Sequence, residues 1–84
     1  VFTGLITSNQ QEPVAYYPVF IERGGDSLDL VETFTDENGI YFQEVEINLG
    51  EAVTVFVKDC ENLEQYIVFY TPDSVNVADF SICV

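Results

Sequence analysis

The chain has 84 residues, of which 48% are hydrophobic and 14% aromatic, and this suffices for one small folded domain. Fifteen Asp and Glu residues outweigh two basic residues, Arg23 and Lys58, and give a formal net charge of −13. This balance excludes a basic nucleic-acid-binding patch and opposes binding to anionic membranes, but it is compatible with a cationic partner or Ca²⁺.

The apolar residues are mostly Val, Ile, Phe and Tyr, and no window has helical periodicity, so the chain is predicted to form strands. The first strand is expected at residues 1–7, and a polar segment separates it from the second at 14–23. Pro18 falls within the second strand, where its missing N–H predicts a sheet edge or a bulge. The sequence GGDS at 24–27 predicts a hairpin turn into the third strand at 28–35.

The sequence DENG at residues 36–39 is the sharpest turn signal in the chain, because Asn-Gly supplies the positive φ angles of tight hairpins. A fourth strand is expected from Ile40. Its alternation changes phase near residues 43–44, which predicts a bulge or a short break.

Three further strands are predicted at residues 51–59, 65–71 and 75–83. Alternation in the first and last of them predicts two inward-facing sets: Val53, Val55 and Val57, and Ala78, Phe80 and Ile82. Seven short strands without helices predict an all-β fold, a seven-stranded antiparallel β-sandwich of the Ig-like or transthyretin-like kind. The sequence starts without Met, leader or apolar span, so we expect residues 1–84 to be a single module cut from a larger protein.

Two cysteines, Cys60 and Cys83, are predicted to form a disulfide bond in an oxidising compartment. Strand alternation directs both side chains away from the main core. The bond would close a loop of residues 60 to 83, about 24 residues, worth roughly 3 kcal/mol in the chain-entropy model. Free buried thiols are the alternative.

The groups that most catalysis requires are missing. The chain has no His to act as a general base, and Lys58 is its only side-chain amine. Close carboxylate pairs are expected by chance among fifteen acids, so they do not indicate a glycosidase. We expect no enzymatic activity, and the lack of His also excludes a Cys/His zinc site.

Four stretches carry a resemblance to a known family: FTGLIT at residues 2–7, VFI at 19–21 after a Glu-Pro pair, TDENGIYF at 35–42 and VTVFVKD at 53–59. Over nearly its whole length the chain resembles carboxypeptidase-regulatory-like domains, which are transthyretin-like, prealbumin-like β-sandwiches related to Cna-B-type modules. The family's best marker is a TDxxGxYxF hairpin. Residues 35–42 depart from it only in that Phe42 directly follows Tyr41.

The resemblance implies a non-catalytic accessory module of a bacterial cell-surface, secreted or periplasmic protein. Such a module acts as a structural spacer or stalk, or as an interaction domain, and its partners include neighbouring domains of the parent protein. The alternative is a ligand-binding module for carbohydrate or protein, with or without calcium. Some Cna-B-type domains contain an isopeptide bond, for which Lys58 is the only candidate here, although its outward position disfavours one.

Two turns are rich in the oxygen ligands that Ca²⁺ prefers, with Asp26 and Asp29 in one and Asp36 and Asn38 in the other. These four are the candidate calcium ligands, and no other cofactor is expected. The second turn lacks the alternating ligands of an EF-hand loop. A turn in which Asp36 accepts hydrogen bonds from its own backbone is the alternative.

Tyr66 and Tyr70 share one face of the strand at 65–71 and form the candidate ligand patch. Partial burial at a sheet edge is the alternative for both. A binder should expose a contiguous aromatic or apolar patch, whereas a spacer should show a mixed polar surface with its two ends on opposite sides.

Overall fold

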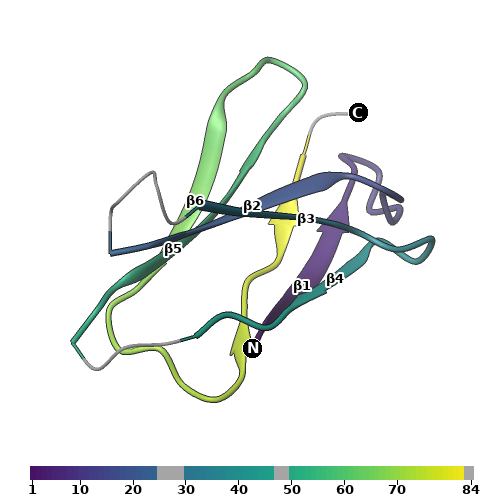
Figure 1. The fold of residues 1–84 in the computed structure, drawn as a ribbon. Helices are drawn as coiled ribbons and strands as arrows, with labels where there is room; N and C mark the ends of the chain where they lie inside the picture. The colour runs from purple at the N-terminus through teal and green to yellow at the C-terminus, as the bar shows by residue number, and fades with distance from the viewer. Residues whose placement is uncertain (25–29, 47–49, 83–84) are drawn as a thin grey trace.

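The computed structural model describes residues 1–24, 30–46 and 50–82, which are all-β and contain no helix. The strands in this part of the chain are β1 (Phe2–Thr7), β2 (Pro18–Arg23), β3 (Leu30–Phe34), β4 (Ile40–Gln43), β5 (Val53–Lys58), β6 (Glu64–Phe69), β7 (Asn76–Val77) and β8 (Phe80–Ser81). They form two sheets in a β-sandwich-like arrangement (Figure 1). No helix able to span a membrane occurs among these residues.

The first sheet has the order β4-β1-β7, and β8 also pairs with β1. β1 and β4 are antiparallel, but β1 runs parallel to both β7 and β8. The prediction of a wholly antiparallel sandwich is therefore wrong in this sheet. Side-chain alternation has the same period in both orientations, so it could not reveal the direction of the pairing.

The strand predicted at residues 75–83 is divided into β7 and β8. Both segments keep one register against β1, because Phe2 lies opposite Asn76 and Ile6 lies opposite Phe80. Between them the Leu5 N–H donates to Asp79 Oδ1 at 2.8 Å instead of to a main-chain carbonyl. The Asp79 side chain thus interrupts the main-chain hydrogen bonds between β1 and the last strand without changing their register.

The second sheet has the order β3-β2-β5-β6 and is antiparallel throughout. β2 starts at Pro18, four residues later than predicted, because Tyr16 has a φ of 56° and the Tyr17 N–H donates to the side chain of Thr35. β2 is a central strand, so the edge predicted at Pro18 is wrong. The first position of a strand tolerates a proline because the missing N–H leaves the ladder intact.

The turn at residues 36–39 forms as predicted but does not make a hairpin within one sheet. β3 pairs with β2 in the second sheet, whereas β4 pairs with β1 in the first. Gly39 has a φ of 78°, and its added Cβ would lie 2.8 Å from Pro13 Cβ and 2.9 Å from Ile6 O. Glycine therefore satisfies both the backbone angle and the close packing of this arch between the sheets.

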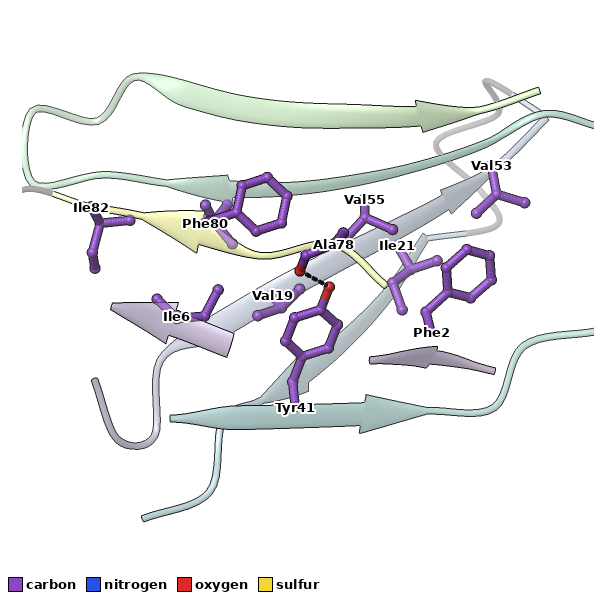
Figure 2. Packing of buried hydrophobic residues seen from close by; sticks show 11 residues of the cluster. Phe2, Ile6, Val19, Ile21, Tyr41, Val53, Val55, Ala78, Phe80 and Ile82 are labelled. Carbon is purple, nitrogen blue, oxygen red and sulfur yellow. Dashed lines mark hydrogen bonds between the residues drawn. The ribbon is translucent and has the colours of Figure 1, made fainter. Parts of the chain in front are cut away.

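The core lies between the two sheets and draws residues from both (Figure 2). Its buried members are Phe2, Ile6, Val19, Ile21, Tyr41, Val53, Val55, Val57, Ala78, Phe80 and Ile82. Both predicted inward-facing sets are therefore confirmed. β4 ends at Gln43, where the alternation changed phase, so the predicted break is also present.

Tyr41 and Gly4 lie close together in the core. The Tyr41 hydroxyl donates to Ala78 O at 2.6 Å, as the dashed line in Figure 2 shows. A Cβ on Gly4 would lie 2.0 Å from the same oxygen and 2.9 Å from Tyr41 Cε1. The first strand therefore requires glycine at this position because the side chain of Tyr41 passes over it to reach Ala78, between β7 and β8.

Candidate functional site

Aromatic side chains line the solvent side of the second sheet. Because Val19, Ile21 and the valines of β5 point inward, the alternate residues of these strands point outward. The register places Phe20 opposite Phe56, and Phe56 opposite Tyr66. Phe34 of β3 lies opposite Pro18 on the same side. We call Phe20, Phe34, Phe56 and Tyr66 the outer aromatic face.

Phe20 and Phe56 form the centre of this face. Their ring centroids are 5.2 Å apart, and the ring planes differ by 17°, so the rings are stacked. Such a cross-strand pair adds about 0.5–1.5 kcal/mol beyond the area it buries. Tyr66 and Phe34 lie on either side and are far more exposed, with 65% and 55% of their surface accessible. The folded domain therefore leaves a contiguous strip of aromatic surface in water.

Carboxylates border the outer aromatic face. Glu32 of β3 lies directly opposite Phe20, and Glu22 is two residues further along β2 on the same side. Glu64 lies opposite Lys58 across β5 and β6. These strands thus present three carboxylates and one ammonium group around the aromatic rings. The border of the face therefore has a net negative charge, as the whole chain does.

The two tyrosines of the predicted ligand patch lie in different surroundings. Tyr66 belongs to the outer aromatic face, whereas Tyr70 lies one residue beyond the end of β6 and is 77% exposed. Sequence reasoning missed Phe20, Phe34 and Phe56. The signal was present in β5, where Phe56 alternates with three inward valines, but which strands lie beside β5 cannot be read from alternation.

The solvent side of the first sheet is also apolar, but its strands β1, β4 and β7 carry no charged side chains. On the first sheet Leu5, Ile40, Phe42 and Val77 are exposed, and Thr3 lies between Phe42 and Val77. Phe42, at 62% exposure, provides a matched comparison for Tyr66.

The candidate calcium ligands of the second turn have a structural role. Asp36 Oδ1 accepts hydrogen bonds from the Asn38 and Ile40 N–H groups at 2.8 and 3.0 Å. Asp59 Oδ1 does the same for Glu61 and Leu63 at 2.9 and 3.0 Å. The same arrangement in two turns identifies both as turns closed by an aspartate side chain, which was the alternative for Asp36.

The other candidate ligands, Asp26 and Asp29, lie outside the described residues. Within ranges 1–24, 30–46 and 50–82, no three acidic or cysteine side chains gather where they could hold a metal ion. Calcium binding by the four candidate ligands stays a prediction.

Cys60 is exposed in the turn that follows β5, in agreement with the predicted outward direction. No cysteine in the described part of the chain carries a free thiol. Cys83 lies outside the described residues, so its predicted bond to Cys60 stays a prediction. Nearby, the Tyr17 hydroxyl donates to Lys58 O, and burial together with the charge of Asp59 raises the pKa of Tyr17.

The chain matches no family model, no curated protein and no solved structure. Its likeness to carboxypeptidase-regulatory-like domains therefore depends on the motif residues alone. The site has to be interpreted from its own chemistry: aromatic surface, a carboxylate border and a sheet that holds both in fixed register.

Proposed function

We propose that this chain is a non-catalytic, extracellular accessory module that binds a partner through the outer aromatic face. The observation that carries the proposal is the exposure of Tyr66 and Phe34 beside the stacked Phe20–Phe56 pair. Contiguous apolar surface of this kind costs solubility and is typical of interaction sites. Aromatic residues are also the side chains that contribute most to binding energy at interfaces.

The finer fold assignment belongs to the same proposal. We infer a transthyretin-like sandwich of seven strands, with β7 and β8 counted as one interrupted strand. The motif at residues 35–42 supports this, because it forms the arch between the sheets and delivers Tyr41 into the core. The TDxxGxY pattern then has a physical reason at each of its four fixed positions: a buried threonine that is hydrogen-bonded to the backbone, a turn aspartate, a glycine with positive φ, and a buried tyrosine.

A spacer role within a larger surface protein is the second candidate, favoured by the direction of the strands. The Asn76 N–H donates to Val1 O at one end of β1, and the Ile82 N–H donates to Thr7 O at the other. The two ends of the described chain therefore lie at opposite ends of β1 (Figure 1). This geometry suits domains joined end to end, and it is compatible with a lateral binding face.

An extracellular, secreted or periplasmic location is proposed from the predicted Cys60–Cys83 bond. The exposed position of Cys60 and the absence of a free thiol among the described cysteines support it. In a reducing cytosol, an exposed cysteine of this kind would be kept as a thiol.

The binding proposal is tested by ¹⁵N NMR titration of the domain with a probe panel: a basic peptide, an acidic peptide, cellohexaose and Ca²⁺. We expect at least one probe to shift the amides of β2, β5 and β6, and to lose its effect in Tyr66→Ser. Phe42→Ser, which removes a similarly exposed ring from the other sheet, should leave the shifts unchanged. If no probe shifts these strands, the spacer role replaces the binding role.

A further inference from the structure

We propose that the occupant of the outer aromatic face is a cationic segment of a partner protein, extended and carrying Arg or Lys side chains. The inference rests on the binding role proposed above and adds the chemistry of the partner. It follows from the combination of exposed rings and carboxylates on one sheet face, in a chain whose formal net charge is −13.

The register orders the groups that would meet such a segment. Glu32, Phe20, Phe56 and Tyr66 form one row across β3, β2, β5 and β6. Adjacent strands are about 4.8 Å apart, so the row spans roughly 14 Å from the carboxylate to the phenol ring. An extended peptide covers that distance in about four residues. Two cations four residues apart would therefore reach both ends of the row.

Each end of the row suits a cation for a different reason. Glu32 supplies an exposed carboxylate, to which a guanidinium donates paired hydrogen bonds. Tyr66 supplies an exposed ring whose face attracts a cation, an interaction that favours Arg. Between them, the apolar stems of Lys or Arg pack on the stacked pair Phe20 and Phe56, as such stems do on apolar surfaces.

Other occupants fit the face less well. A second copy would bring another −13 charges to a face bordered by carboxylates, and anionic lipid or nucleic acid would meet the same repulsion. A neutral oligosaccharide stacks on open ring faces, but Phe20 and Phe56 each cover one face of the other. Lys58 lies opposite Glu64, at the β6 side of the face. Glu22 and Glu32, toward β3, have no basic residue opposite them in the sheet register. A cationic protein segment uses both the rings and these acids.

Isothermal titration at about 20 mM salt tests the proposal with a capped ten-residue peptide of Ser and Thr carrying Arg at positions 3 and 7. Peptides with Gln or Glu at these positions, and cellohexaose, are the comparison ligands. We expect binding of the Arg peptide alone, weakened by rising salt because exposed charges are screened. Tyr66→Ser should weaken binding by about three- to fivefold, and Glu32→Gln by about two- to fivefold.

Matched controls separate this site from general attraction to an acidic protein. Phe42→Ser removes an exposed ring from the other sheet, and Glu37→Gln removes an exposed charge from the turn between the sheets. Both should bind the Arg peptide as the parent domain does. Equal losses in Glu32→Gln and Glu37→Gln, with no loss in Tyr66→Ser, would overturn the proposal, because they would show that net charge alone drives binding.

The remaining outcomes separate the two proposals. Cellohexaose binding that depends on Tyr66, without Arg-peptide binding, would refute the cationic partner and keep a binding face. Self-association abolished by Tyr66→Ser would likewise refute it in favour of a second copy. If no ligand binds and no variant changes the association state, both the cationic partner and the binding role fail.

Discussion

Gly4→Ala is the substitution for which the structure predicts the largest effect from the smallest change. Gly4 has an ordinary extended conformation in β1, so alanine would cause no backbone strain. The added methyl group would instead lie 2.0 Å from Ala78 O and 2.9 Å from Tyr41 Cε1. Either Ala78, in the segment between β7 and β8, moves away from β1 or the tyrosine ring is displaced, and both weaken or break the Tyr41–Ala78 hydrogen bond.

The expected cost has two parts. Overpacking a closed core costs about 1–3 kcal/mol. Leaving the buried hydroxyl and carbonyl without their 2.6 Å bond costs a further 1–3 kcal/mol or so. The sum, about 2–6 kcal/mol, is a large share of the roughly 4–13 kcal/mol expected for a domain of 84 residues. At about 4–8 °C for each kcal/mol, the melting temperature should fall by about 10 °C or more.

Guanidinium denaturation and thermal melting measure this loss, and Gly50→Ala provides the matched control. Gly50 has a φ of 85° with no atom within 4 Å of an added Cβ, so alanine there meets backbone strain but no steric overlap. Its cost should be about 1 kcal/mol. If Gly4→Ala is no more destabilising than Gly50→Ala, Gly4 does not lie as close to Ala78 and Tyr41 as the structure shows.

Three further predictions concern pH, redox state and salt. Burial, reinforced by the charge of Asp79, raises the pKa of Tyr41, and burial raises the pKa of Tyr17. Above about pH 10 the unfolded chain therefore loses phenolic protons that the folded chain keeps. The free energy of unfolding should be highest below about pH 10 and should fall as the pH rises above it. Thermal melts at increasing pH, with tyrosine ionisation followed by absorbance at about 295 nm, measure this loss. Reduction should lower stability by roughly 3 kcal/mol if Cys60 and Cys83 are bonded, and an unchanged melt would refute the bond. Raising NaCl to about 0.5 M should raise the melting temperature, because a net charge of −13 repels itself.

Alternation along the chain predicted the inward residues of β5 and of β7–β8 because period-two patterns report burial directly. It could not predict strand neighbours, which depend on contacts far apart in sequence. For this reason the parallel pairing of β1 with β7 and β8 was missed. Pro18 was misplaced for a related reason: sequence shows a missing N–H, but not that the proline opens the strand.

The candidate site was predictable only in the part that one strand contains. Tyr66 stood out because it shares one face of its own strand with Tyr70. Phe20 and Phe56 come from strands separated by a long stretch of sequence, and their stacking exists only once β2 pairs with β5. For the turn at 36–39, sequence offered both a calcium loop and a turn closed by Asp36. The hydrogen bonds to Asp36 Oδ1 show that the closed turn forms, while calcium binding there stays a prediction.

Tyr66→Ser should separate binding from folding, because the core is complete without the outer aromatic face. Tyr66 is 65% exposed and lies on the solvent side of β6, so its replacement removes part of a cross-strand contact worth about 0.2–1 kcal/mol. Val55→Ala, on the inner face of the neighbouring strand, should cost about 2 kcal/mol because Val55 is fully buried. Denaturant unfolding of both variants checks the contrast. If Tyr66→Ser is as destabilising as Val55→Ala, Tyr66 is held by folding contacts, and its exposure no longer points to a partner.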